Sequence, residues 1–194
     1  MAAEPVQVVI EGLEGEALKN VQAALTLPPG VVSEGGVDRA LLELFRRQIP
    51  EKVKKALEPF GYYEAQVSST REKSENGREL LRVKVIPGNP IRATSVIVRV
   101  TGPGENNLEL RQLVAAFPLK AGDVLNQVKY EQAKEELRTK ALNQGYLGSE
   151  YTSHVIRVNR AERKAEIELI LQTGSRYLFG EVIWEGTQLY PVSY

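Results

Sequence analysis

The stretch Ala56-Leu57-Glu58-Pro59-Phe60-Gly61-Tyr62-Tyr63 closes a run of helical sequence on a glycine followed by a tyrosine. About 85 residues later a second helical run closes in the same way, on Gly145-Tyr146-Leu147. Before each closure a short strand stops at a glycine, and after it two strands stop at a small residue plus glycine. These landmarks are Gly12, Pro87-Gly88, Gly102 and Thr173-Gly174. A repeat of this length exceeds that of a solenoid and predicts a string of small domains.

Hydrophobic periodicity predicts the element order β-α-α-β-β in both copies. The first copy has expected strands at residues 6–11, 65–70 and 80–85, with helices at 16–27 and 37–60. The second has expected strands at 96–100, 151–158 and 165–171, with helices at 108–117 and 127–143. Pro50 lies inside the long apolar stripe of the first copy, and it predicts a kink or a restart of that helix.

The predicted fold class is α+β, with tandem domains that each hold a three-stranded mixed sheet covered on one face by two helices. The expected boundaries are residues 1–88 for the first domain and 89–175 for the second. Residues 176–194 are expected to be the first strand of a truncated third domain, around Val182-Ile183-Trp184-Glu185-Gly186. The first two domains are joined by Pro87, Gly88, Asn89 and Pro90, and two prolines with few free torsions predict a semi-rigid link.

Composition narrows the class of partner. The 194 residues include 25 Lys plus Arg and 25 Asp plus Glu, so the formal net charge is zero. This balance argues against nucleic acid or an anionic membrane as the main partner, since both need a positive face. No apolar run reaches the length of a membrane span. The stretch Met1-Ala2-Ala3-Glu4-Pro5 lacks a basic and an apolar region, so no signal peptide is visible and both ends are expected to be truncations.

Catalytic and metal chemistry find no support in the sequence. The chain has no cysteine, and His154 is its only histidine, so neither a metal site nor a nucleophile with a histidine base is expected. Glycine-rich phosphate-binding patterns are also missing. We therefore expect no enzyme activity and no cofactor, and we expect His154 to be a surface residue on the polar, outward-facing side of its strand.

A basic cluster raises the alternative of an RNA-binding module. The β-α-α-β-β order is similar to that of KH domains, but those need a Gly-x-x-Gly loop between their helices, and residues 28–36 and 118–123 contain none. Nucleic-acid binding is therefore not expected. The basic cluster consists of Arg46, Arg47, Lys52, Lys54 and Lys55. We expect it to face a partner protein or anionic lipid head groups.

The repeat resembles the POTRA domain of outer-membrane assembly proteins. Within that group the chain is similar to the TamA family of translocation and assembly module subunits, over essentially its whole length. The residues that carry this closer resemblance are residues 56–63, Val124-Leu125-Asn126, Lys129-Tyr130-Glu131 and Tyr177-Leu178-Phe179-Gly180. The break at Pro50 departs from the pattern expected for the first domain. The alternatives are a POTRA arm of a BamA-type or two-partner-secretion transporter.

The resemblance implies an arm at the periplasmic face of the outer membrane of a Gram-negative bacterium. Its expected partners are unfolded outer-membrane or autotransporter chains, a TamB-like inner-membrane protein and its own C-terminal barrel. The implied mechanism is β-augmentation, in which an extended segment adds to an exposed sheet edge. A rigid periplasmic spacer that binds no client is the structural alternative.

The first strand of each predicted hairpin is the expected binding edge. The candidate residues are Ala65, Gln66, Val67, Ser68 and Ser69 in the first domain, and Tyr151, Thr152, Ser153, His154 and Val155 in the second. In addition, residues 179–185 form an apolar strand without sister strands. We expect this strand to pair with another copy of the chain or to be poorly ordered, because an orphan strand edge seeks a partner.

Overall fold

The computed structural model describes residues 5–33, 36–74, 77–178 and 180. The first domain begins with β1 (Val6–Glu11) and α1 (Gly15–Ala24), followed by a small hairpin of β2 (Val32–Ser33) and β3 (Gly36–Val37). It continues with α2 (Arg39–Leu57), the short 3-10 helix η1 (Glu58–Phe60), and the strands β4 (Gln66–Lys73) and β5 (Glu79–Ile86). The strand order is β1-β5-β4, and β5 pairs parallel with β1 and antiparallel with β4.

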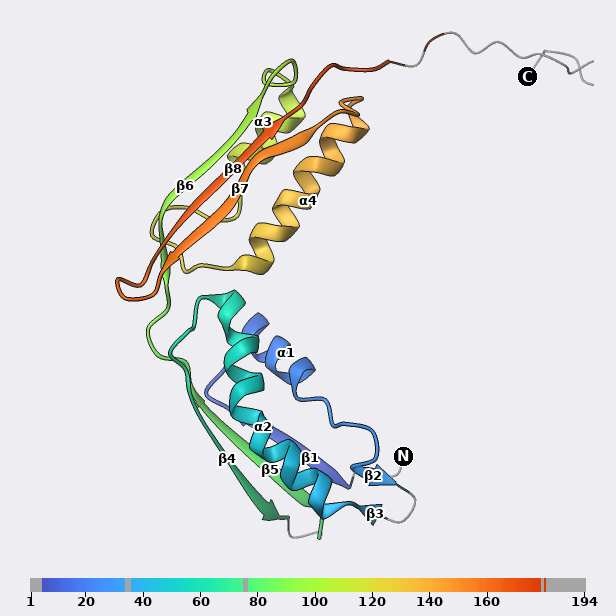
Figure 1. The fold of residues 1–194 in the computed structure, drawn as a ribbon, viewed down its shortest axis with the longest axis vertical. Helices are drawn as coiled ribbons and strands as arrows, with labels where there is room; N and C mark the ends of the chain where they lie inside the picture. The colour runs from blue at the N-terminus through green and yellow to red at the C-terminus, as the bar shows by residue number, and fades with distance from the viewer. Residues whose placement is uncertain (1–4, 34–35, 75–76, 179, 181–194) are drawn as a thin grey trace, which may run out of the picture.

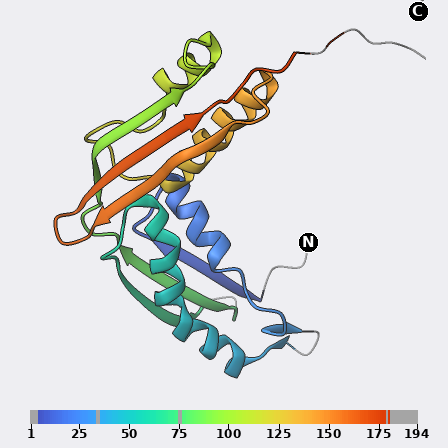
Figure 2. The same cartoon turned by 45° about the horizontal axis from the view of Figure 1, so that its top comes forward.

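The second domain repeats this plan without the small hairpin. Its elements are β6 (Arg92–Thr101), α3 (Leu108–Ala115), α4 (Gln127–Asn143), β7 (Glu150–Asn159) and β8 (Lys164–Gln172). The strand order β6-β8-β7 again places a parallel and an antiparallel neighbour on either side of the last strand. The two domains lie end to end in Figure 1, and Figure 2 shows the helix pair of each on one face of its sheet. The prediction of two mixed three-stranded sheets, each covered by two helices, is confirmed.

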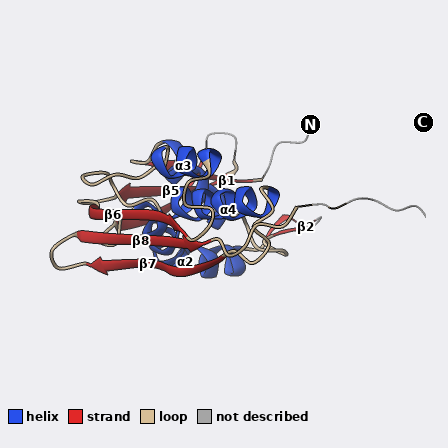
Figure 3. Cartoon of the chain, turned by 90° about the horizontal axis from the view of Figure 1, so that it is seen from above, coloured by secondary structure: helices blue, strands red, loops and turns tan. Residues whose placement is uncertain are grey.

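Each domain buries its own core between the sheet and the helices. Alternate residues of the central strand face the helices, which explains the strict alternation in the sequence. In β5 these are Leu81, Val83 and Val85, and in β8 they are Ala165, Ile167, Leu169 and Leu171, all 2% exposed or less. The two core clusters share no buried residue. Figure 3 shows the strands in red with the helices in blue.

Side-chain caps begin three of the helices. Asp38 accepts hydrogen bonds from the backbone N–H groups of Ala40 and Leu41, at 2.9 and 3.0 Å. Asn126, the cap predicted from the sequence, accepts from Lys129 N at 3.0 Å, and Asn107 caps α3 in the same way. A cap of this kind stabilises a helix by about 1 kcal/mol.

Pro50 does not restart the long helix of the first domain. Helix α2 runs continuously from Arg39 to Leu57 with Pro50 inside it. Because proline has no N–H, it leaves the carbonyl of Arg46, four residues earlier, without its usual helical partner. The hydroxyl of Ser69 on β4 donates to that carbonyl at 3.4 Å. Ile49 is fully buried beside the proline, so core packing holds the helix together across the break in its hydrogen bonds.

Candidate binding edges and the domain junction

Each sheet has two free edges within the part of the chain that the structure describes. They are β1 and β4 in the first sheet, and β6 and β7 in the second. The strands expected to bind partners, around residues 65–69 and 151–155, lie on β4 and β7, with Ala65 buried just before β4. An edge strand carries unpaired backbone N–H and C=O groups, and these are the groups that an added strand uses.

The hydrogen-bond ladder shows which β4 residues turn their backbone groups to the free edge. The Glu79 N–H bonds to the carbonyl of Pro5, so the odd-numbered residues of β5 face β1 and the even-numbered ones face β4. The β4 residues paired with even-numbered β5 residues therefore direct their backbone N–H and C=O groups to β5. Those between them, including Val67 and Ser69, point their backbone groups outward.

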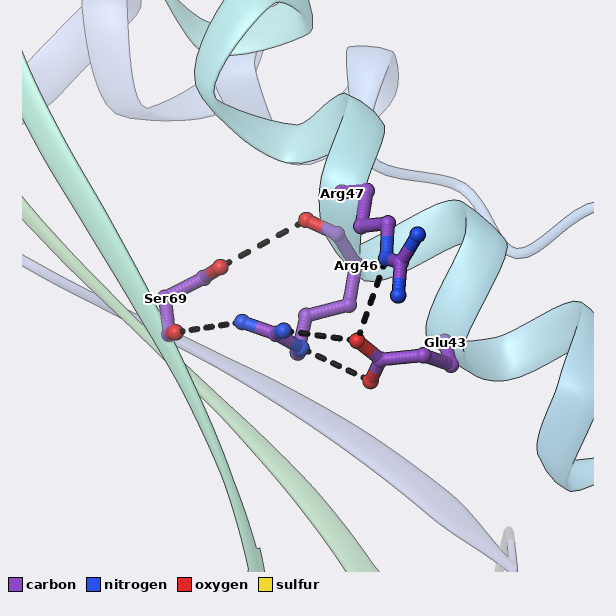
Figure 4. Close-up of polar contacts among 4 residues, drawn as sticks. All are labelled: Glu43, Arg46, Arg47 and Ser69. Carbon is purple, nitrogen blue, oxygen red and sulfur yellow. Dashed lines mark hydrogen bonds and ion pairs between the residues drawn. The ribbon is translucent and has the colours of Figure 1, made fainter.

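One of these outward groups is already occupied. Arg46 of α2 donates from Nη1 to the carbonyl of Ser69 at 3.0 Å, while the Ser69 hydroxyl donates to the carbonyl of Arg46. Figure 4 shows the two residues facing each other across the space between helix and strand. Sequence reasoning placed Arg46 in a surface cluster and missed this contact. Arg46 therefore blocks the middle of the β4 edge against an incoming strand.

Glu43 holds the Arg46 side chain in place. The guanidinium donates from Nη2 and Nε to the two carboxylate oxygens of Glu43, at 2.7 and 2.9 Å (Figure 4). Arg47 lies 3.5 Å from the same carboxylate. The bonds from Arg46 lower the pKa of Glu43 to about 2. Bidentate pairing fixes the direction of a guanidinium, so the group that blocks Ser69 is preorganised.

The titration of Glu43 tests this arrangement. Because its pKa is lowered in the folded state, the stabilisation from the pair is complete above the ordinary glutamate pKa and is lost as the pH falls through about 2. We expect a carboxyl-carbon NMR titration of the folded protein to give a midpoint near that value. The Arg46→Ala variant should raise the midpoint toward the ordinary range, with Arg47 still beside the carboxylate. A midpoint that is the same in both proteins would contradict the ion pair.

The edge of the second sheet differs from this arrangement. Thr173 N bonds to Thr101 O, so the odd-numbered residues of β8 face β6, and β7 bonds to the even-numbered ones. His154 and Ile156 pair with odd-numbered residues, so their backbone groups point outward. In the part of the chain that the structure describes, no side chain bonds to the backbone of either residue. The β7 edge is therefore open where β4 is blocked.

The structure corrects the expected orientation of His154. A bulge between Tyr151 and Ser153 shifts the register, so His154 lies opposite the fully buried Leu169 and not on the outward face beside Thr152. Its ring meets that of Tyr151 edge to face, with centroids 6.3 Å apart. An extra residue in one strand reverses the side-chain alternation beyond it. His154 remains exposed, at the margin of the helix-covered face.

The junction involves more than the predicted residues Pro87, Gly88, Asn89 and Pro90. Tyr63 of the first domain packs against the second core, and its hydroxyl accepts a hydrogen bond from Gln127 Nε2 at 3.0 Å. The Arg160 guanidinium lies 4.6 Å from the centre of the Tyr63 ring. Burial raises the pKa of this phenol. The sequence signal for this contact is Tyr63, the second tyrosine of the first Gly-Tyr closure. The second closure has Leu147 at the equivalent position.

Gly61 fixes the start of the second domain. It has a φ of +83°, and its carbonyl accepts the N–H of Ile91 at 2.9 Å. A β-carbon at Gly61 would lie 3.0 Å from the carbonyl oxygen of Leu125 and 3.2 Å from that of Ile91. The second closure repeats the arrangement, since Gly145 has a φ of +88° and accepts the N–H of Tyr177 at 2.7 Å. Both glycines close a helix and hold the chain that leaves the domain.

Neither a metal centre nor a membrane span is found among the described residues. They contain no group of three or more His, Cys, Asp or Glu side chains placed to hold a metal ion. None of their helices combines the length and the apolar character needed to cross a bilayer.

Two protein-family models match the chain, one for each sheet. Residues 7–87 match the model described as POTRA domain, TamA domain 1. Residues 96–172 match the POTRA model, whose description is surface antigen variable number repeat. The chain therefore belongs to the POTRA-domain proteins. Within them, its first domain is of the TamA type.

Several solved structures match the chain at low identity. BamA POTRA3-5 of Haemophilus influenzae is 17% identical, with 95% of this chain and 71% of that chain covered and a TM-score of 0.45. POTRA1-2 of the periplasmic domain of Omp85 from Anabaena is 16% identical, with 89% and 94% covered and a TM-score of 0.34. CdiB from Escherichia coli is also 16% identical, with 89% and 27% covered and a TM-score of 0.30. The family assignment comes from the two model matches alone.

Proposed function

We propose that this chain is the periplasmic arm of a TamA-type outer-membrane assembly or translocation protein. The match of the first domain to TamA domain 1 supports this choice over a BamA-type or two-partner-secretion transporter. The arm receives extended outer-membrane or autotransporter chains, or a segment of a TamB-like partner, and passes them toward the barrel of the full-length protein. It needs no cofactor and performs no catalysis. Residues 176–194 begin a third domain in this proposal; all of them beyond 178 except Gly180 lie outside the described residues.

The open edge of β7 is the observation that carries the proposal. His154 and Ile156 present backbone groups to the free edge, and no described side chain occupies them. Main-chain hydrogen bonds recognise an extended chain whatever its sequence, which suits a receiver of many clients. On β4 the same role falls to residues 65–69, where Arg46 must first release Ser69. The binding strands of the proposal are therefore β7 first and β4 second.

A proline at His154 tests the β7 edge. The substitution His154→Pro removes an outward N–H and leaves every β7–β8 ladder bond in place. The probe is a fluorescein-labelled ten-residue peptide with alternating apolar and polar residues, the pattern of a transmembrane β-strand. We expect fluorescence anisotropy to show binding about tenfold weaker, from one lost hydrogen bond and the added ring.

The control is His154→Ala, which removes the imidazole but keeps the N–H. Its affinity should stay close to that of the unmodified protein, and circular dichroism should show both variants folded. An equal loss of peptide affinity in the two variants would show that the effect comes from the imidazole side chain, and it would contradict the edge mechanism. If the unmodified protein binds no extended peptide, the rigid spacer remains, a role that the Tyr63 and Gly61 contacts of the junction support.

A further inference from the structure

Helix α2 has an exposed apolar surface as well as its buried one. Leu42 and Phe45 face the first core, with exposed fractions of 0 and 1%, whereas Leu41 and Leu44 are 40% and 55% exposed. Residues three or four apart share a face of a helix, so the two exposed leucines lie together. They form an apolar patch that the packing of α2 within its own domain does not use.

The same face becomes basic toward the end of the helix. Continuing at spacings of three and four residues, it contains Gln48 and then Lys52 and Lys55. Glu51 also lies on this face, but Lys54 Nζ pairs with its carboxylate at 3.5 Å. No acid among the described residues pairs with Lys52 or Lys55. We call this surface the outer face of α2; it consists of Leu41, Leu44, Gln48, Lys52 and Lys55.

The charge of α2 differs from that of the rest of the chain. The helix has six basic and two acidic residues, although the two kinds are equal in number over the whole chain. The equivalent helix of the second domain, α4, lacks this excess at the matching positions. Counted back from the glycine that closes each helix, Lys52 corresponds to Glu136, and Thr139 stands in the place of Lys55. The basic face is therefore a feature of the first domain and not of the repeated fold.

We propose that the outer face of α2 is a docking surface for an amphipathic helix of a partner protein, apolar in one half of its contact face and acidic in the other. Helices recognise one another through residues at spacings of three and four, and charges beside the apolar contacts select the partner and the register. Apolar side chains of the partner cover Leu41 and Leu44, and its carboxylates pair with the two lysines. This surface lies on a helix and not on a sheet edge, so it is independent of strand binding at β7.

Charge reversal at Lys55 tests the proposal on the intact chain. The probe is a fluorescein-labelled peptide of about 20 residues, long enough to form a helix in water, with leucines in one half of one face and glutamates in the other half. A second peptide has lysines in place of the glutamates. In fluorescence anisotropy we expect Lys55→Glu to weaken binding of the acidic peptide about tenfold and to strengthen binding of the basic one. Leu44→Ala should weaken binding of the acidic peptide by about the same factor.

Thr139→Glu is the matched control. It places the same charge at the equivalent exposed position of α4, so the affinity for the acidic peptide should stay unchanged. Circular dichroism should show all three variants folded, because each substituted side chain is exposed. The affinity of the unmodified chain for the acidic peptide should fall with added salt, since exposed charges are screened.

Three results would overturn the proposal. Failure of the acidic peptide to bind the unmodified chain would show that the outer face of α2 accepts no such helix. Equal losses in Lys55→Glu and Thr139→Glu would reduce the effect to a general repulsion between charges. Binding of phosphatidylglycerol vesicles in preference to the peptide, weakened by Lys55→Glu, would assign the face to an anionic lipid surface.

Discussion

Gly12→Ala should destabilise the first domain by about 3 kcal/mol, from backbone strain of about 1–2 kcal/mol and a clash. Gly12 ends β1 with a φ of +90°, and a β-carbon there would lie 2.0 Å from the carbonyl oxygen of Val85. A backbone atom cannot rotate away, so the parallel pair of β1 and β5 must separate at this end. For a domain of this size the loss corresponds to a fall in Tm of roughly 15 °C, which differential scanning calorimetry would measure.

Gly30→Ala is the matched control for this prediction. Gly30 has nearly the same φ, +87°, but a β-carbon there would meet only the Leu41 side chain, at an ordinary contact distance of 3.5 Å. The control therefore carries the strain without the clash and should cost about 1–2 kcal/mol. Equal destabilisation by the two substitutions would contradict the close approach of Val85 to Gly12.

Phe45→Ala should destabilise the first domain and leave the stability of the second unchanged. Phe45 is 1% exposed in the first core, and truncating such a side chain costs about 3–5 kcal/mol through lost burial and the cavity left behind. The second core shares no buried residue with it. In a urea titration followed by amide NMR, Val83 should report unfolding at a lower concentration than in the unmodified protein. Leu169 should report an unchanged midpoint.

The neighbouring residue supplies the control for Phe45. Leu44 lies on the same helix and is 55% exposed, so Leu44→Ala should change stability by no more than about 0.5 kcal/mol. Joint loss of the Val83 and Leu169 signals in Phe45→Ala would show that the domains unfold as one unit. The Tyr63 and Gly61 contacts would then couple the two domains energetically as well as geometrically.

The sequence predicted those parts of the fold that depend on local pattern. The alternation of Leu81, Val83 and Val85 identified β5, because a central strand with one buried face leaves a period of two. The Gly-Tyr closures, with the positive φ of Gly61 and Gly145, marked where the helices stop. Both signals lie within a few residues of the structure that they predict.

What the sequence did not predict depends on contacts between distant residues. Nothing local indicates that Arg46 reaches Ser69, 23 positions away, or that the same contact satisfies the carbonyl left open by Pro50. The bulge after Tyr151 likewise has no signature in an alternating strand, so His154 was assigned to the wrong face. Both errors bear on the binding edges, because the free groups of an edge strand depend on register and neighbours.

The two Gly-Tyr turns hold the chain that follows each of them by the same kind of backbone hydrogen bond. Ile91 leaves the first domain on a hydrogen bond to Gly61, and Tyr177 leaves the second on the equivalent bond to Gly145. Neither glycine has room for a β-carbon: at Gly145 it would lie 2.2 Å from the carbonyl oxygen of Tyr177. The exits from the two domains thus share one backbone bond, but the second exit has Leu147 where the first has Tyr63. The bond fixes where the chain leaves each domain, whereas the angle to the next domain depends on side chains that differ between the two exits.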